Sequence, residues 1–252
     1  MTERRVRGAG PLSGPRAALS FLTVLPVGGH QTAASVHLGR AWFPAVGVLV
    51  GGAAGGALWL VSGATTAAVG AVAALGVLAV LTGALHLDGL ADTADGLLGG
   101  ATRERRLDIM RDPRVGSYGL VAVVLVLLGD WAALSSVPPL QALVALLAGG
   151  ALARFAVVCV LFGLPYARPE GVGSAAKGGP APLELAVAGV TAMLPIALDW
   201  RHGLLAVALV AAATVGLAAL ARARIGGATG DVYGAVVELG QLAALVGFSV
   251  KL

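Results

Sequence analysis

His86-Leu-Asp-Gly-Leu-Ala-Asp-Thr-Ala-Asp-Gly96 is the stretch around which the chain is organised. Its carboxylates, Asp88, Asp92 and Asp95, are four and then three residues apart, so on a helix they share one face. An apolar run without a charged residue precedes them and begins after Arg40. Aligned carboxylates at the end of such a run are costly unless a cation binds them. The stretch therefore predicts a metal site at a membrane surface.

The composition indicates an all-α, polytopic membrane protein. Of the 252 residues, 58% are hydrophobic and 12% are charged, whereas a soluble domain carries about 25% charged residues. The single cysteine, Cys159, excludes an intrachain disulfide and a multi-cysteine metal site. A net charge of +4 is too small to indicate nucleic acid. We therefore expect a lipid bilayer and no nucleic acid among the partners, and the sequence leaves open whether the chain forms a homo-oligomer.

The hydropathy pattern predicts about seven transmembrane helices in one integral membrane domain, residues 1–252. Residues 1–16 form a basic tail, and the apolar segment 17–27 is too short to cross a bilayer, so we expect an interfacial or re-entrant helix that ends near Pro26. Glycines at four-residue spacing in the first span predict close helix packing. The expected spans are residues 41–61, 65–85, 118–134, 139–161, 183–198, 203–220 and 232–250.

Lysine and arginine are distributed unequally between the two sides of this bundle. Fourteen of them fall on the side of the basic tail and the long polar loops, and two fall on the opposite side. Loops on the cytoplasmic side of a membrane carry the excess of these residues. We therefore expect the long loops, and with them the segment 86–117, to face the cytoplasm as the active-site segment.

A second group of acids follows the aspartate stretch. Asp108 and Asp112 have helical spacing, as do the acids of the aspartate stretch. Two helices, one for each group, can therefore present carboxylates to one or two divalent cations. Oxygen ligands of this kind favour Mg²⁺, or Mn²⁺, over zinc. Carboxylate-held metals and arginines that fork onto phosphate oxygens are typical of phosphoryl transfer. The interleaved arginines are Arg103, Arg105, Arg106, Arg111 and Arg114, of which the first three also fit a simple positive-inside anchor.

Four further residues carry charge in places that need an explanation. Arg168 and Glu170 lie in a glycine-rich polar loop. Asp231 follows the loop Gly226–Gly230 at the start of a predicted helix, where it is either a substrate ligand or a helix N-cap. Glu238 lies seven residues further on, on the same helical face, and no cap explains it. We predict that Arg168, Glu170, Asp231 and Glu238 bind substrate.

These motifs resemble the cobalamin synthase family of bacterial membrane enzymes. The resemblance implies that the 3′-hydroxyl of α-ribazole, or of its 5′-phosphate, attacks the phosphate attached to cobinamide in adenosylcobinamide-GDP. GMP then leaves, adenosylcobalamin or its 5′-phosphate forms, and Mg²⁺ is the expected cofactor, in a multi-pass protein of the cytoplasmic membrane. The segments that carry the resemblance are Phe21-Leu-Thr-Val-Leu-Pro26, Phe43-Pro-Ala-Val-Gly47, His86–Gly96, Leu107-Asp-Ile-Met-Arg-Asp-Pro-Arg-Val-Gly-Ser-Tyr-Gly119, Pro165-Tyr-Ala-Arg168 and Gly230-Asp-Val-Tyr-Gly234.

Two other interpretations fit part of the pattern. The central acids are similar in order to the motif of the CDP-alcohol phosphotransferases of lipid synthesis, although here the acids are more closely spaced and the Ala-Arg step of that motif does not align. A cation-coupled transporter also places acids in the membrane. Against a transporter, the acids cluster beside the polar loops rather than at mid-bilayer.

Within the transferase interpretation, each of these residues has an expected role. Asp88, Asp92, Asp95 and Asp108 are expected to hold metal, and Asp112 to take the proton of the attacking hydroxyl as a general base. Arg111 and Arg114, with Arg168, are expected to bind the pyrophosphate or the leaving GMP.

Overall fold

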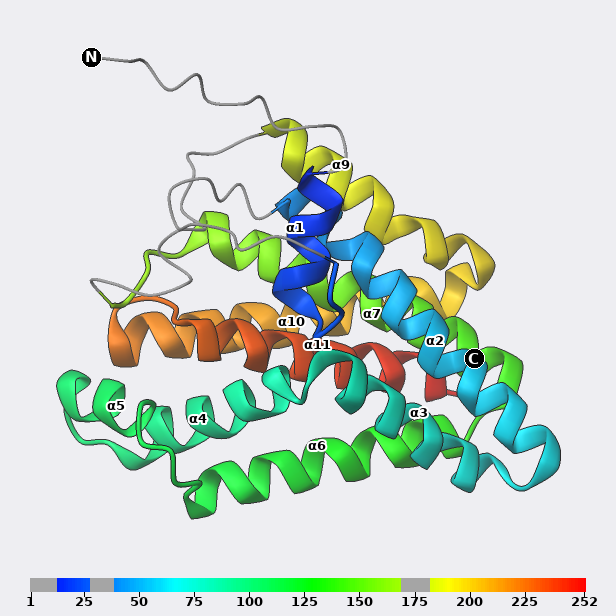
Figure 1. The fold of residues 1–252 in the computed structure, drawn as a ribbon, viewed down its shortest axis with the longest axis horizontal. Coiled ribbons are helices and arrows are strands. Elements are labelled where there is room, and N and C mark those ends of the chain that lie inside the picture. The colour runs from blue at the N-terminus through cyan, green and yellow to red at the C-terminus, as the bar shows by residue number, and fades with distance from the viewer. Residues whose placement is uncertain (1–12, 28–38, 169–181) are drawn as a thin grey trace.

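The computed structural model describes residues 13–27, 39–168 and 182–252. Within these ranges the secondary structure is helical, apart from one isolated bridge between Tyr166 and Ala228, so the predicted all-α fold is confirmed. Glu170 lies outside the described residues, as does the tail up to residue 12. The elements, arranged as Figure 1 shows, are α1 (Ser13–Leu22), η1 (Arg40–Trp42), α2 (Phe43–Ala64), α3 (Ala67–Thr82), α4 (Leu85–Gly99), α5 (Arg103–Ile109), α6 (Ser117–Ser135), α7 (Pro139–Gly163), α9 (Pro182–Met193), η2 (Leu194–Leu198), α10 (Trp200–Ile225) and α11 (Gly230–Ser249).

Fewer helices than predicted are long enough to cross a bilayer. The described residues contain five such helices, η1–α2, α6, α7, α10 and α11, or six crossings if α3 and α4 count together as one. The expected span at 183–198 is instead the 12-residue helix α9 followed by the 3-10 helix η2. Twelve helical residues cover about 18 Å, against a hydrocarbon core of about 30 Å. The prediction of seven spans is thus slightly too high, while the polytopic character is confirmed.

The predicted second span is broken directly before the aspartate stretch. Helix α3 ends at Thr82, and Gly83 and Ala84 both adopt left-handed backbone conformations, with φ of 61° and 54°. The Ala84 amide donates to the Ala79 carbonyl and the Gly83 amide to the Val80 carbonyl, which is a Schellman termination. Helix α4 then leaves at 89° to α3. A positive φ is unfavourable for alanine, so this bend is held by the surrounding packing and sets the direction of the acid-bearing helix.

Glycines bring α2 and α7 into backbone contact, as the spacing in the first span predicts. A Cβ on Gly47 would collide with the backbone of Gly150, and one on Gly150 would collide with Gly47. One turn further along, a Cβ on Gly51 would meet the Leu146 backbone. Close backbone approach of this kind replaces hydrophobic association inside a membrane. The α2–α7 pair therefore forms one rigid side of the bundle.

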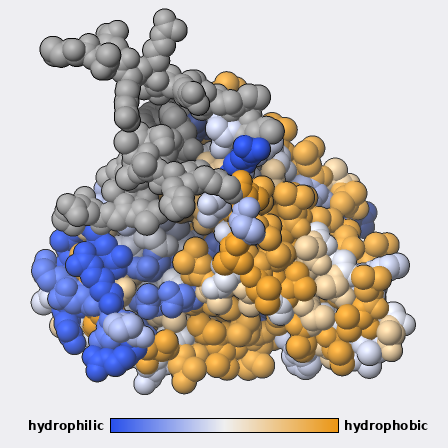
Figure 2. Space-filling view, in the orientation of Figure 1, coloured by the Kyte–Doolittle hydropathy of each residue, from blue (hydrophilic) through white to orange (hydrophobic). Residues whose placement is uncertain are grey.

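Helix α11 occupies the centre of the bundle. It packs against α4, α6, α7 and α10 (Figure 1), and most of its side chains are buried. Figure 2 shows hydrophilic residues gathered over α5 at one end of the molecule, with hydrophobic residues covering most of the rest of this face. The first turn of α11 faces the segments that carry the predicted site, so its position decides which polar side chains meet.

Candidate active site

Helices α4 and α11 cross at two glycines, and this crossing brings the acids of the two helices together. A Cβ on Gly89 would lie 2.8 Å from the Asp231 carbonyl oxygen, and a Cβ on Gly234 would lie 3.1 Å from the His86 carbonyl oxygen. Asp92 consequently interacts electrostatically with Asp231, and both interact with Asp88. The structure therefore gathers three of the predicted site residues from two helices that are far apart in the sequence.

The start of α11 is fixed by pairing with the segment that follows α7. The Ala167 amide donates to the Ala228 carbonyl at 2.8 Å, and the Ala228 amide donates to the Pro165 carbonyl at 2.9 Å. Thr229 has an extended backbone, and its hydroxyl accepts the Val232 amide. Thr229 is therefore the N-cap, and the alternative interpretation of Asp231 as the cap is wrong, because α11 already begins at Gly230.

With the cap supplied by Thr229, the Asp231 carboxylate is available to other groups. Arg168 Nη2 lies 2.9 Å from Asp231 Oδ2 in a largely buried ion pair, and the Thr229 hydroxyl donates to the same oxygen at 3.1 Å. Arg168 also approaches the Met110 carbonyl, just after α5, at 3.5 Å. Arg168 and Asp231, each predicted separately to bind substrate, are thus in direct contact with each other.

Two cavities meet at Arg168. The first has a volume of about 560 Å³ and lies between α1, α4, α7 and α11, with Asp88, Arg168 and Asp231 in its wall. The second has a volume of about 460 Å³, and its wall includes Asp108 and Arg111. Tyr166 and Arg168 line both cavities. Both volumes lie in the range of about 300–1,000 Å³ that is usual for small-molecule sites, so two ligand portions can meet beside one guanidinium group.

The chemistry of the donors at this junction fits a hard divalent cation. In the described parts of the chain, no group of three or more His, Cys, Asp or Glu side chains is arranged so that it could hold a metal ion. Magnesium, however, commonly uses one or two carboxylates and takes its other ligands from water and substrate phosphates. Asp88 is exposed and lines the first cavity together with Asp231, while the half-buried Asp92 lies beside them and interacts electrostatically with both. A cation bound there would relieve the repulsion between these carboxylates.

Asp95 has different partners from the other acids of α4. Its carboxylate accepts the Gly116 amide at 2.7 Å and the Gly119 amide at 2.9 Å. These amides belong to the N-terminus of α6, where the first N–H groups lack helical partners. The residue before α6, Gly116, makes no side-chain cap. Asp95 of α4 therefore caps the N-terminus of α6, and this contact joins the two helices.

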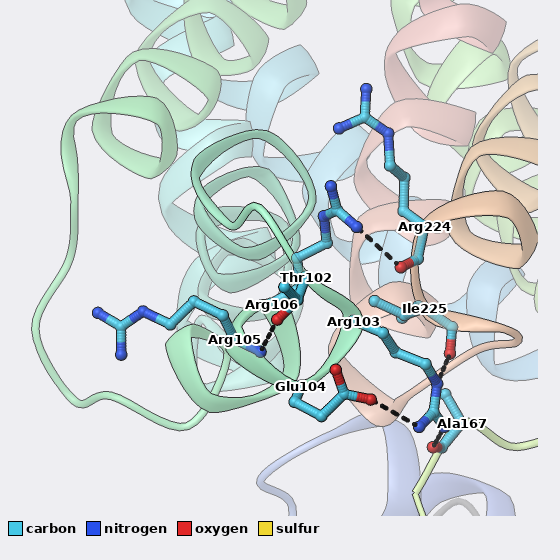
Figure 3. A network of polar contacts seen from close by, with 8 residues as sticks. All are labelled: Thr102, Arg103, Glu104, Arg105, Arg106, Ala167, Arg224 and Ile225. Carbon is cyan, nitrogen blue, oxygen red and sulfur yellow. Dashed lines mark hydrogen bonds and ion pairs between the residues drawn. The ribbon is translucent and has the colours of Figure 1, made fainter.

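Two of the three arginines of α5, Arg103 and Arg106, bind backbone carbonyls, whereas the Arg105 side chain extends away from them (Figure 3). Arg103 donates to the Ile225 carbonyl at 2.9 Å and to the Ala167 carbonyl at 2.8 Å, and Arg106 donates to the Arg224 carbonyl at 3.2 Å. The two carbonyls at residues 224 and 225 belong to the C-terminal turn of α10, where cations are favoured by the helix dipole. Arg103 and Arg106 thus attach α5 to the core, whereas Arg111 faces the second cavity.

Asp112 and Arg114 form a pair with each other. Arg114 donates from Nε and Nη2 to the two carboxylate oxygens at 2.9 and 2.7 Å, and its backbone amide donates to Asp112 Oδ1 at 3.1 Å. The hydrogen bonds from the Arg114 side chain and backbone hold the pKa of Asp112 at about 2, below its usual range. A carboxylate of such low basicity is a weak proton acceptor at neutral pH.

Glu238 lies deeper in the bundle than the other predicted substrate ligands. It borders a small cavity of about 20 Å³ together with His86, Asp130, Arg154 and Gln241, whereas the 560 Å³ cavity reaches only His86 of this group. The sequence analysis did not select Asp130, although one acid inside the apolar run 118–134 is a sufficient signal. Arg154, a buried cation of α7, interacts electrostatically with Glu238.

The fold defines a class, multi-pass membrane proteins, and in this one acids and arginines gather beside two cavities. Comparison with known families identifies the member of this class. The model of the family described as "Cobalamin-5-phosphate synthase" matches residues 14–249. The chain therefore belongs to this family of cobalamin-biosynthesis transferases.

Curated relatives agree with this assignment. The chain is 42% identical over 238 residues to the adenosylcobinamide-GDP ribazoletransferase of Bradyrhizobium diazoefficiens, with 92% of this chain and 91% of the relative covered. It is 41% identical to the enzyme of the same name from Chlorobaculum parvum, covering 92% and 93%, and 38% identical to that of Mesorhizobium japonicum, covering 93% and 92%. The family resemblance seen in the motifs is therefore confirmed. No solved structure matches the chain.

Proposed function

We propose that this chain is an adenosylcobinamide-GDP ribazoletransferase whose reaction takes place around Arg168 and Asp231. One observation supports this location of the active site: the ion pair between Arg168 and Asp231 lies beside the acids of α4 and at the junction of two ligand-sized cavities. The substrates, adenosylcobinamide-GDP and α-ribazole or its 5′-phosphate, are those named for the curated relatives and implied by the motifs. Two substrates and one shared guanidinium group match a reaction that joins two molecules through a phosphate.

The reaction forms one P–O bond and breaks another. The 3′-hydroxyl oxygen of the acceptor bonds to the phosphorus attached to cobinamide, the P–O bond to the guanylate phosphate breaks, and GMP leaves with the bridging oxygen. The hydroxyl proton passes to a base. Arg168 and Arg111, which face the second cavity together, bind the phosphate oxygens and offset the charge that develops on GMP.

Mg²⁺ is the proposed cofactor, with Mn²⁺ as a substitute, and Asp88, Asp92 and Asp231 are the residues we assign to hold it. When bound, it would neutralise phosphate charge and lower the barrier to attack. Asp108, in the wall of the second cavity, is available to a second ion. Asp95 supports this set by positioning α4 against α6 rather than by offering a free carboxylate.

The proposed site faces the cytoplasm of a bacterial membrane. The support is the excess of lysine and arginine on the loops at this end of the bundle, together with the hydrophilic surface over α5 that Figure 2 shows. Both substrates are charged or polar molecules, so an opening on that side suits them.

A transfer assay tests the proposal. Detergent-purified protein is incubated with adenosylcobinamide-GDP, α-ribazole and Mg²⁺, and cobalamin formation is followed by chromatography and absorbance. We expect metal-dependent product and a large loss in Asp92→Asn. Folded protein that makes no cobalamin would overturn the function. Transfer from CDP-activated lipid alcohols, or cation-driven uptake into proteoliposomes without chemistry, would support the two other interpretations.

A further inference from the structure

The N-terminal helix forms one wall of the larger cavity. Ser20, Phe21 and Leu22 of α1 line it. The Phe21 ring stacks on Phe43 of α2, with ring centroids 5.5 Å apart and planes at 12°. The Val24 amide donates to the Leu81 carbonyl at 3.0 Å, which attaches the chain beyond α1 to the end of α3. Helix α1 is therefore held in place as a wall of a binding cavity.

The cavity is polar at one end and apolar at the other, because α4 and α11 run antiparallel along it. Gly89 lies against the Asp231 backbone, whereas the preceding turn of α4, at His86, lies against Gly234. Asp88 and Asp231 thus share the end near the loops. In the same register, Leu85 and Val237 share the opposite, inner end.

Helix α7 closes the inner end. Val157 of α7 lines the cavity and is 1% exposed, Val237 of α11 is 2% exposed, and Leu22 of α1 is 2% exposed. These side chains provide no hydrogen-bonding groups. The inner part is therefore suited to a flat apolar group, and the outer part, with Arg168, is suited to a hydroxyl or a phosphate.

The volume decides between the two substrates. A cavity of about 560 Å³ accommodates a nucleoside-sized molecule, but a corrin macrocycle that carries an adenosyl group is several times too large. The second cavity is lined by three arginines, Arg103, Arg111 and Arg168, and by two acids, Glu104 and Asp108. Its arginines suit the diphosphate of the other substrate, and its acids suit a divalent cation bound with that diphosphate. The macrocycle exceeds the second cavity too, at about 460 Å³, so only the diphosphate portion of adenosylcobinamide-GDP is assigned there, and the nucleoside-sized substrate is assigned to the first cavity.

Resting on the proposed function, we propose that the cavity between α1, α4, α7 and α11 is the acceptor subsite. The dimethylbenzimidazole base of α-ribazole lies at the inner end against Leu85, Val157 and Val237. The ribose extends outward, so that its 3′-hydroxyl reaches Asp88, Asp231 and Arg168. The subsite also selects the base. His86, beside Leu85 in the wall, has a buried Nδ1 without a partner and can bond one ring nitrogen, whereas a purine would also have to bury further nitrogens and an amino group against Val157 and Val237.

Substitutions at Val237 test the subsite. Val237→Phe fills the inner end, and we expect the KM for α-ribazole to rise about tenfold or more while the KM for adenosylcobinamide-GDP stays within about twofold. Val237→Ala enlarges the same space. We expect Val237→Ala to increase kcat/KM for a riboside with one additional fused ring, relative to kcat/KM for α-ribazole. If Val237→Phe does not fold, the result with Val237→Ala tests the subsite alone. Val215→Phe, at a position of α10 that is 67% exposed, is the matched control.

Two readouts separate failure of this inference from failure of the proposed function. A higher KM for adenosylcobinamide-GDP in Val237→Phe, with that for α-ribazole unchanged, would assign the cavity to the donor and overturn the inference. An unchanged base preference in Val237→Ala would also overturn it. Equilibrium binding of α-ribazole is measured in parallel. Suppose that the wild-type protein binds α-ribazole, that Val237→Phe abolishes this binding, and that neither protein catalyses transfer. This result would support the acceptor subsite and overturn the proposed function.

Discussion

Gly89 and Gly234 face each other where α4 crosses α11, so that a Cβ on either residue would lie 3.2 Å from the Cα of the other. This contact lies within one turn of Asp88, Asp92 and Asp231, and it is the reason that the acids of the two helices are neighbours. Gly89, which directly follows Asp88, therefore has a steric function of its own: it sets the distance between the acids of α4 and those of α11.

Adding one methyl group at this crossing should disrupt the site. In Gly89→Ala the new Cβ would lie 2.8 Å from the Asp231 carbonyl oxygen, so α4 must move away from α11. Displacements of about 1 Å at a catalytic site cost roughly 10²-fold, and we expect a loss in kcat/KM of about that size. Gly76→Ala in α3, where a Cβ meets nothing within 4 Å, is the control and should retain activity. A fully active Gly89→Ala enzyme would contradict the role of the crossing.

Arg168 should depend on its shape as well as on its charge. Its guanidinium group binds Asp231 at 2.9 Å and still faces both cavities. Lysine keeps the charge but loses the forked set of donors. We expect Arg168→Lys to lower kcat/KM for adenosylcobinamide-GDP by about 10²-fold, measured against Arg201→Lys, whose side chain is exposed. Equal activity of the two variants would show that Arg168 acts only as a point charge or is outside the site.

Asp95 and Asp92 should respond differently to the same substitution. In Asp95→Asn one of the two oxygens that accept the α6 amides becomes a donor, so we expect a loss of about 1–3 kcal/mol in stability and a Tm lower by about 3–10 °C. The Mg²⁺ concentration for half-maximal activity should not change. In Asp92→Asn we expect the opposite pattern, with little change in Tm and a higher Mg²⁺ requirement. A raised Mg²⁺ requirement in Asp95→Asn would restore Asp95 to the metal ligands.

The sequence predicted those features that depend on local pattern or on simple energetic cost. Charged groups are too costly in or beside an apolar run to lack a partner, so the acids of the aspartate stretch were identified as residues that need a cation or another partner. Glycine spacing predicted close packing in the first span, which the contact between Gly47 and Gly150 confirms. These inferences needed no knowledge of which helix lies beside which.

The features that escaped prediction depend on contacts between distant segments. Nothing local to Ala84 predicts a left-handed alanine, since the bend is imposed by the packing of α3 and α4. The use of Asp95 as a cap for α6 depends on a contact across 21 residues to Gly116. For α9, the apolar pattern was correct, but the change to a 3-10 helix at Leu194 shortened the helix below a membrane crossing. Helical spacing alone placed all three acids in one role, whereas the structure gives Asp95 a separate one.

The pH dependence of the reaction should not arise from Asp112. Hydrogen bonds from Arg114 lower the pKa of Asp112 to about 2 in the folded protein. A lowered pKa stabilises the fold above the pKa of the unfolded chain and loses this effect only as the pH falls toward 2. Between about pH 5 and pH 9 Asp112 is therefore ionised throughout. We expect the pH profile of kcat/KM in Asp112→Asn to keep the shape of the wild-type profile. Loss of the pair with Arg114 can change the magnitude of kcat/KM but not its dependence on pH. An acidic limb that is present in the wild type and absent in Asp112→Asn would instead identify Asp112 as the general base and show that its pair with Arg114 opens when substrate binds.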